Sequence, residues 1–408
     1  MKIKIGVTFV LIVLIISIST VEAIHNINED ETPSSGLANI TQTYEQTEIE
    51  MKNYIGKIND KSLPFYGYNT WKTEELVQGP VSFNPATPGI IDQIAPTTSN
   101  SFISGATWAL GKWYGCEFSL GEGDPFIWTI NTVIGEMSVI GSYDMEETNL
   151  SFNGLAYDYI SGKMYGCSNT ALYRVNMNTG ASSFVGNFGI SDGVMIAITF
   201  DESGNLYGTE LTTDCLYLIN TLNGKATKVG NGLGIDINFA QDMAFDIDNE
   251  ILYLSAYTIS PVKEGALYTC NKFTGVAEKV GTFQEAAEIT GFAIPYCGIP
   301  QINPSTISGG ILRIGESKIK ASVKNIGGLP CTNVTLKIAN KRSIILSVGS
   351  KEIIPTLNPG ETVEVSTSML IGFGFLTKTL IVTVTESSCG KTESIPKNAL
   401  MFGLLWAC

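Results

Sequence analysis

The residues that could do chemistry in this sequence are carboxylates, because histidine is almost absent. His25 is the only histidine among 408 residues, which excludes a Ser/His/Asp triad and lyases that depend on histidine. The sequence has no Cys-x-x-Cys pair and no Gly-x-x-x-x-Gly-Lys-Ser/Thr motif. Zinc-finger sites and a phosphate-binding loop are therefore excluded, and we expect no metal site and no cofactor.

A group of acidic residues is the candidate ligand-binding site. They fall in segments that connect one predicted group of strands to the next, and these segments contain no Lys or Arg. Such a surface is expected to be negative and to bind a cation, a sugar or a basic peptide. The alternative is a solvated face of an acidic protein. The residues are Asp144, Glu146, Asp192, Asp236 and Glu288.

Asp242 completes the candidate site from a different position, inside a predicted inner strand. A buried carboxylate needs a partner or an ion. Asp242 is therefore either a ligand-binding group or is hydrogen-bonded to amides of neighbouring strands. Two carboxyl groups about 5–10 Å apart in one pocket would also suit glycoside hydrolysis.

Other notable side chains have simpler interpretations. Asp158, Asp201, Asp246 and Asp248 fall at predicted turns, where Asp commonly bonds its own backbone. Trp71 has no counterpart in the repeats described next, so we expect it to be exposed.

The elements that position these residues are internal repeats. Four segments share aromatic–Gly and Thr–Gly spacings, and their terminal glycines follow one another at 45, 44 and 51 residues. Each segment contains four short apolar runs separated by turn residues, which is typical of one blade of a β-propeller. The glycines are Gly141, Gly186, Gly230 and Gly281.

Both ends of the repeat array contribute to one more blade. Gly291–Ile294 resembles a first strand with nothing after it, whereas Tyr66–Gly67 and Val81–Asn84 resemble the missing strands. Joining them closes the ring and removes free sheet edges. We predict an all-β chain with a five-bladed propeller over residues 63–298, or six blades if residues 41–62 contribute.

The repeat pattern, with pairs such as Tyr165-Gly166 and Thr179-Gly180, resembles the YVTN/NHL-like propellers of secreted microbial proteins over about residues 64–297. The resemblance implies the fold but no particular function.

After a predicted linker over residues 299–308, residues 309–408 show alternating short strands, which predict an Ig-like β-sandwich. The turns Lys324–Gly327 and Asn358–Glu361 resemble those of CARDB-type Ig-like domains of archaeal and bacterial surface proteins. That resemblance implies a stalk, spacer or adhesion module without catalytic residues. Within this domain we predict a disulfide between Cys331 and Cys389, because disulfides are usual in exported chains.

The N-terminus predicts export. Residues 1–23 have the basic start, short apolar run and small-x-small end of a signal peptide, with an uncleaved membrane anchor as the alternative. Residues 24–62 predict a flexible leader with a short helix. Outside the cytoplasm, the sequons at Asn39, Asn149 and Asn333 would be glycosylation sites. The net charge of −14 makes nucleic acid an unsuitable partner.

Together these features predict a secreted or cell-surface protein. Our leading hypothesis is a non-enzymatic binding, adhesion or cell-envelope protein whose propeller face recognises a glycan or a protein. A hydrolase that resembles glycosidases and uses axial carboxylates is one alternative. A purely structural surface spacer is the other.

Overall fold

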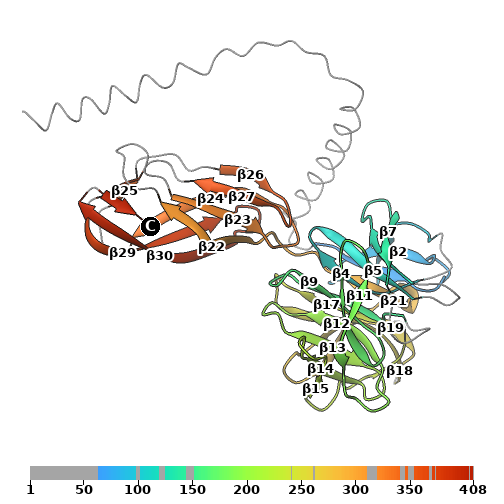
Figure 1. Ribbon diagram of the computed structural model, residues 1–408. Helices are drawn as coiled ribbons and strands as arrows, with labels where there is room; N and C mark the ends of the chain where they lie inside the picture. Colours follow the sequence, from blue (N-terminus) through green and yellow to red (C-terminus); the bar gives the residue numbers. More distant parts are fainter. Residues whose placement is uncertain are drawn as a thin grey trace, which may run out of the picture. The chain divides into compact units, whose positions relative to one another are not determined.

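The computed structural model shows a chain built from β-strands (Figure 1). Within the described part, regular helix is limited to the short 3-10 turn η1 (Gln284–Ala286). In that part no helix has the length and apolar character needed to cross a membrane. The described residues are 63–97, 102–118, 125–143, 151–239, 241–260, 262–309, 319–340, 345–347, 353–366, 370–372, 374–403 and 405–407.

Several predictions fall outside these residues. They are the signal peptide at 1–23, the leader at 24–62 with Asn39, and the loop residues Asp144, Glu146 and Asn149.

Five antiparallel sheets form the propeller blades. Blade 1 combines strands from both ends of the repeat array, and blade 5 has one extra short strand, β16 (Asp236–Ile237). In order from the inner to the outer strand, the blades are β21 (Ile289–Ala293), β1 (Phe65–Asn69), β2 (Gly79–Phe83) and β3 (Ile91–Gln93); β4 (Phe102–Ala109), β5 (Lys112–Phe118), β6 (Phe126–Ile130) and β7 (Met137–Ser142); β8 (Gly154–Asp158), β9 (Lys163–Cys167), β10 (Ala171–Val175) and β11 (Ser182–Asn187); β12 (Met195–Phe200), β13 (Leu206–Glu210), β14 (Cys215–Ile219) and β15 (Ala226–Val229); β17 (Asp242–Asp246), β18 (Ile251–Ser260), β19 (Glu264–Cys270) and β20 (Ala277–Thr282).

The predicted closure of the ring is confirmed. In blade 1, Tyr66 lies opposite Ala293 and Tyr68 lies opposite Thr290, while Val81 pairs with Gly67. The inner strands contact one another in the order β21, β4, β8, β12, β17 and back to β21. Five blades therefore complete the ring, and no gap remains for a sixth.

Close approach of neighbouring blades explains the recurring glycines. A Cβ atom added to Gly105 in the inner strand β4 would lie 2.4 Å from the Cα atom of Gly154 in β8. At the outer edge, a Cβ on Gly141 would lie 2.0 Å from the carbonyl oxygen of Thr179 in the next blade. The glycines therefore recur in the sequence because neighbouring blades approach closely at positions such as these two, where only glycine fits against the next blade.

The C-terminal strands form two larger sheets and one small sheet. The apolar core lies between the two larger sheets, with Ala321 and Val323 from one and Val334 and Val382 from the other. This is a β-sandwich, and its assignment to the Ig-like class stays a prediction. The sheets are β22 (Pro300–Gly309), β23 (Ile319–Asn325) and β27 (Thr362–Ser366); β26 (Ile353–Leu357), β24 (Cys331–Asn340), β29 (Gly374–Thr385), β30 (Thr392–Gly403) and β31 (Leu405–Ala407); β25 (Ile345–Ser347) and β28 (Leu370–Gly372).

The predicted linker at residues 299–308 is wrong, because Pro300–Gly309 forms strand β22 and pairs with β23. Its Pro and Asn residues resembled a linker, yet Ile302 and Ile307 point into the sandwich core. The connection between the two parts is correspondingly short.

The predicted Cys331–Cys389 disulfide is also wrong, because Cys389 is bonded to Cys297. Cys331 is a free thiol inside the sandwich core, and burial raises its pKa to about 12. Cys297 reaches Cys389 because the chain enters the sandwich directly after the last inner strand of the propeller. Four further buried cysteines are free: Cys116, Cys167, Cys215 and Cys270.

Candidate functional site

Antiparallel pairing divides the loops of the propeller between its two ends. The loop face carries the connections between blades and those between second and third strands, including residues 70–78, 188–194, 211–214 and 283–288. The turn face carries the tight turns between first and second strands and between third and fourth strands, including residues 158–162, 201–205, 246–250 and 271–275.

Trp71 is an exposed aromatic residue of the loop face, as its lack of a repeat counterpart predicted. Its side chain is 53% exposed, and its ring centroid lies 6.4 Å from that of Phe102. Phe102 stacks in turn on Phe118, with centroids 5.3 Å apart. The three rings form a row across blades 1 and 2, which we call the aromatic row.

Acidic side chains from residues 285–288 hold the Trp71 loop in place. The Trp71 Nε1–H donates to Glu288 Oε2 over 3.1 Å. Glu285 Oε2 accepts hydrogen bonds from the Thr73 hydroxyl and, over 2.9 Å, from the Glu75 amide. The backbone amide of Thr70 donates to the Glu288 carbonyl over 2.9 Å. The indole is therefore presented in a fixed position rather than on a free loop.

Glu288 is half-buried at the junction of blades 1 and 5. Burial raises the pKa of its carboxyl group, while hydrogen bonds from Trp71 and Tyr257 and the positive charge of Lys263 act in the opposite direction. Lys263 Nζ lies 5.9 Å from the centroid of the Tyr257 ring. The site thus combines an aromatic surface with a carboxylate whose hydrogen-bonding capacity is only partly used.

Asn69 lies in the interior at the same end of the closing blade. It is fully buried and lies opposite Ile289, the residue after Glu288. Its Nδ2 donates to the Val77 carbonyl over 2.9 Å, so the side chain is turned towards the Trp71 loop. Its Oδ1 has no hydrogen-bond partner in the described part of the chain.

The other predicted loop residues do not join this cluster. Asp192 is exposed, has a φ of 53°, and accepts a hydrogen bond from Ser191. Asp236 lies in β16, and its charge adds to burial in raising the pKa of Asp214. Of the predicted set, Glu288 alone is shown in contact with an exposed aromatic ring.

Asp242 is sealed inside the ring of inner strands. Its Oδ2 accepts from the amides of Ala106 over 2.9 Å and Phe292 over 2.8 Å, and its Oδ1 accepts from Met243 over 2.8 Å. Burial raises its pKa well above the ordinary Asp value. Of the two interpretations left open by the sequence, the structure shows the hydrogen bonds to strand amides. Asp242 joins the inner strands of blades 1, 2 and 5.

The aspartates of the turn face bond their own turns, as predicted. Asp158 Oδ1 accepts from the amides two and three residues later, and Asp246 Oδ1 does the same. Asp201 Oδ1 accepts from the amides of Ser203 and Asn205. Asp248 differs, because its Oδ2 accepts from the Cys297 amide.

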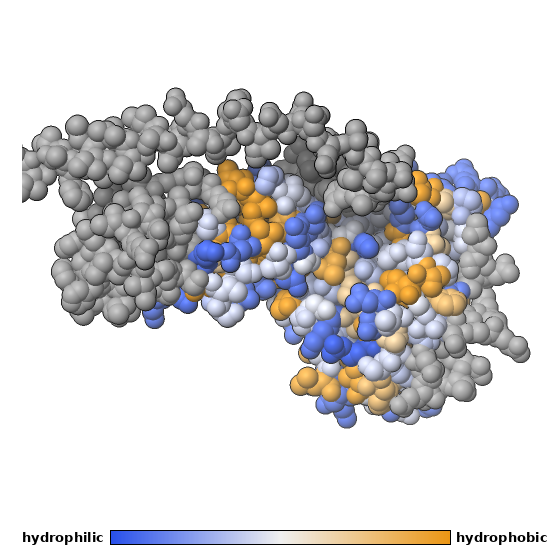
Figure 2. All heavy atoms as spheres, turned by 45° about the horizontal axis from the view of Figure 1, so that its top comes forward, coloured by the Kyte–Doolittle hydropathy of each residue, from blue (hydrophilic) through white to orange (hydrophobic). Residues whose placement is uncertain are grey.

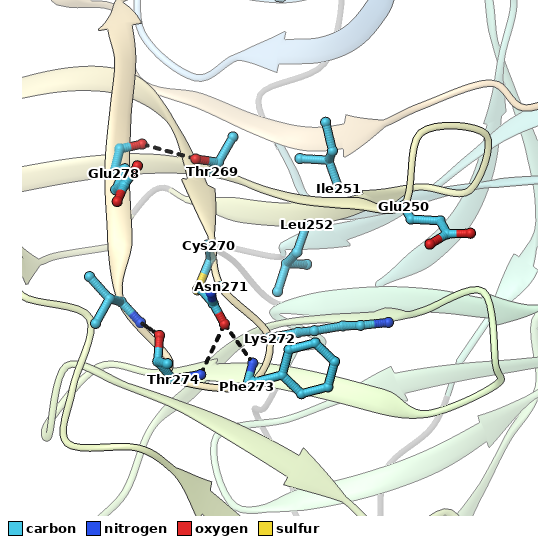
Figure 3. Close-up of a pocket in the computed structure, with 11 residues that line it drawn as sticks. Glu250, Ile251, Leu252, Thr269, Cys270, Asn271, Lys272, Phe273, Thr274 and Glu278 are labelled. Atoms are coloured by element: carbon cyan, nitrogen blue, oxygen red, sulfur yellow. Dashed lines mark hydrogen bonds between the residues drawn. The ribbon is translucent and has the colours of Figure 1, made fainter.

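A hollow of about 340 Å³ lies on blade 5 beside the turn face (Figure 3). Two of its polar side chains are already engaged. Asn271 Oδ1 accepts from the amides of Phe273 and Thr274, and Lys272 forms ion pairs with Asp201 and Glu202 of blade 4. Burial raises the pKa of the Cys270 thiol to about 12, so that the thiol stays protonated.

Other exposed apolar residues occur on the surface of the described part, among them Val133 and Ile134. The face drawn in Figure 2 shows apolar residues in small groups separated by polar ones. Phe273, at the tip of a turn, is 78% exposed without a comparable set of fixed polar partners. Single exposed apolar residues are normal on protein surfaces, so the fixed polar surroundings of Trp71 are what distinguish it.

Asn333, the sequon residue inside the sandwich, is exposed, and its Nδ2 donates to Ser387 Oγ over 3.0 Å. Its glycosylation stays a prediction.

Comparison with known proteins assigns no family to this chain. The sequence matches no protein-family model and no curated protein. A crystal structure of a nidogen/laminin complex is 12% identical with a TM-score of 0.38, over 56% of this chain and 97% of that chain. A protein of unknown function from Bacteroides caccae is 11% identical with a TM-score of 0.38, over 57% and 98%. Virginiamycin B lyase from Staphylococcus aureus is 12% identical with a TM-score of 0.30, over 76% and 95%.

With TM-scores below 0.5, these similarities assign neither a family nor a function to this chain. The propeller is shown by the five sheets of the structure itself. The resemblances to YVTN/NHL-like propellers and to CARDB-type domains stay predictions.

Proposed function

We propose that this chain is an exported, non-enzymatic binding protein that holds a carbohydrate on the aromatic row of its propeller. The observation that carries the proposal is Trp71, an exposed indole fixed by Glu288 and continued by Phe102 and Phe118. Aromatic faces pack against the apolar C–H faces of sugar rings, and a few fixed polar groups then orient the ligand. Secretion or display at the cell surface is part of the proposal and is supported by the N-terminal sequence.

Binding without catalysis agrees with how the acids are used. Glu285 fastens the Trp71 loop, Glu288 holds the indole, and Asp242 is enclosed by backbone amides. A hydrolase would need two carboxyl groups that face one substrate, and no specific contact among the described residues favours that arrangement.

The proposal is tested by screening the mature chain against a panel of glycans and then measuring affinity for the best ligand by calorimetry. We expect Trp71→Ala to weaken binding at least tenfold, or about 1.4 kcal/mol, because it removes the exposed stacking surface. Phe273→Ala is the matched control, since it removes an exposed ring at the turn face. Equal affinity of wild type and Trp71→Ala, or hydrolysis of a glycan in the panel, would overturn the proposal.

A further inference from the structure

The hydrogen-bonding group beside the exposed ring of Trp71 is an acceptor, the carboxylate of Glu288. A carboxylate offers about four acceptor positions, and within the described residues Trp71 and Tyr257 are the donors shown for Glu288. Glu288 is half-buried rather than enclosed, so a ligand that brings N–H or O–H donors can bond its remaining positions.

The net negative charge of the surface around Glu288 narrows the class of ligand further. The segments 70–78 and 283–288, with Lys263 beside them, contain four carboxylates and two lysines. Asp192 and Asp236 add negative charge to the same face. Such a surface attracts cations, and the attraction weakens as salt concentration rises.

Resting on the function proposed above, we infer that the ligand is an oligosaccharide with free amino groups, whose sugar rings stack on the aromatic row while an ammonium group donates to Glu288. Both halves of the site are then used. Trp71 offers an exposed ring for one sugar. The half-buried rings of Phe102 and Phe118, which stack on each other, extend the apolar surface beside it, whereas a single lysine side chain would cover one ring only. The ammonium group supplies donors and the positive charge.

The experiment compares three β-linked oligomers of equal length by calorimetry on the full mature chain: glucosamine, N-acetylglucosamine and glucose. We expect the glucosamine oligomer to bind at least tenfold more tightly than the other two. This advantage should shrink when salt is raised from about 50 to about 500 mM. Glu288→Gln should abolish the advantage, whereas Trp71→Ala should weaken the binding of every oligomer that binds.

Asp192→Asn is the matched control, because it removes a carboxylate from the same face without touching Glu288. It should leave the preference for glucosamine within about twofold of wild type, as expected for a screened surface charge.

The outcomes separate this inference from the function on which it rests. Equal affinity for the three oligomers, with loss in Trp71→Ala, would overturn the amino-sugar inference and leave carbohydrate binding intact. Binding of a Lys- and Arg-rich peptide as tightly as the glucosamine oligomer, with the same dependence on Trp71, would overturn it in favour of a protein partner. If glucosamine oligomers failed to bind while other glycans bound through Trp71, the amino-sugar inference would also be overturned. If no glycan bound, the proposed function itself would fail.

Discussion

Two pairs of carboxylates, one pair on each face of the propeller, form opposite kinds of hydrogen bond. On the turn face, Asp158 and Asp201 accept hydrogen bonds from amides of their own turns, two to four residues away. On the loop face, Glu285 and Glu288 accept hydrogen bonds from a segment more than 200 residues distant. The first arrangement stabilises a local turn, whereas the second presents an exposed indole. The carboxylate that we place in the ligand site, Glu288, is therefore distinguished by its bond to an exposed aromatic ring.

Asp242 extends this comparison to the interior, where a carboxylate serves neither face. Its three amide partners come from blades 1, 2 and 5, including the strand that closes the ring. The carboxylates can thus be ranked by how much each contributes to stability, from those that stabilise the fold to one that we propose binds a ligand. Measuring the free energy of unfolding of each variant tests that ranking.

The largest loss of stability is expected from Asp242→Ala. The substitution leaves three buried amides without acceptors, and we expect the free energy of unfolding to fall by about 3–5 kcal/mol. Urea denaturation of the mature chain measures it. If Asp242→Ala cost no more than a substitution at an exposed turn, the axial carboxylate would not be part of what holds the ring closed.

The pH dependence of stability should also report Asp242. Its pKa is raised in the folded state, whereas the unfolded value is about 3.9. Below the unfolded pKa both states are protonated, so the contribution of the neutral acid is fully present. As pH rises towards the folded pKa, the unfolded state ionises first and stability is lost. The stability of wild type relative to Asp242→Asn should therefore decrease as pH rises above about 4. A constant difference would contradict the raised pKa.

An intermediate loss is expected from Asp201→Ala on the turn face. Asp201 bonds the amides of its own turn, and its Oδ2 lies 3.0 Å from Lys272 Nζ of blade 5. We expect a loss of about 2–3 kcal/mol. Asp158→Ala is the matched variant, because it removes the same kind of turn bonds without a cross-blade lysine, and about 1 kcal/mol is expected. Equal losses would mean that Lys272 adds nothing to the junction. Sugar binding should be unchanged in both variants.

The comparison also shows what could be predicted from sequence. The blades and their closure were predictable because close contact between neighbouring blades requires glycine at repeated positions, such as Gly105 and Gly141, and this repetition is visible in the sequence. The Asp turns were predictable for the same reason, since their partners lie within a few residues. The Cys297–Cys389 bond was not predictable, because it depends on where β22 begins, and the Pro and Asn residues of that strand resembled a linker.

The Trp71–Glu288 pair was missed although a signal for it existed. Joining Tyr66 and Phe292 in one sheet already implies that residues 70 and 288 lie at the same end of that sheet. By residue type alone, Trp71 is an exposed ring and Glu288 is one of several acids. The register of the closing blade, followed to its end, brings the two together.

The smallest loss of stability is expected from Glu288→Gln, which is also the variant that most sharpens the contrast between the faces. Glutamine keeps an oxygen that can accept from Trp71 Nε1, and the group is only half-buried, so we expect a loss of about 0.5 kcal/mol or less. The measurement pairs urea denaturation with calorimetric binding of the glucosamine oligomer. Asp201→Ala should show the reverse pattern, with reduced stability and unchanged binding. If Glu288→Gln destabilised the fold as much as Asp201→Ala, Glu288 would be a structural carboxylate like those of the turn face, because its hydrogen bonds would then stabilise the closing blade rather than position a ligand.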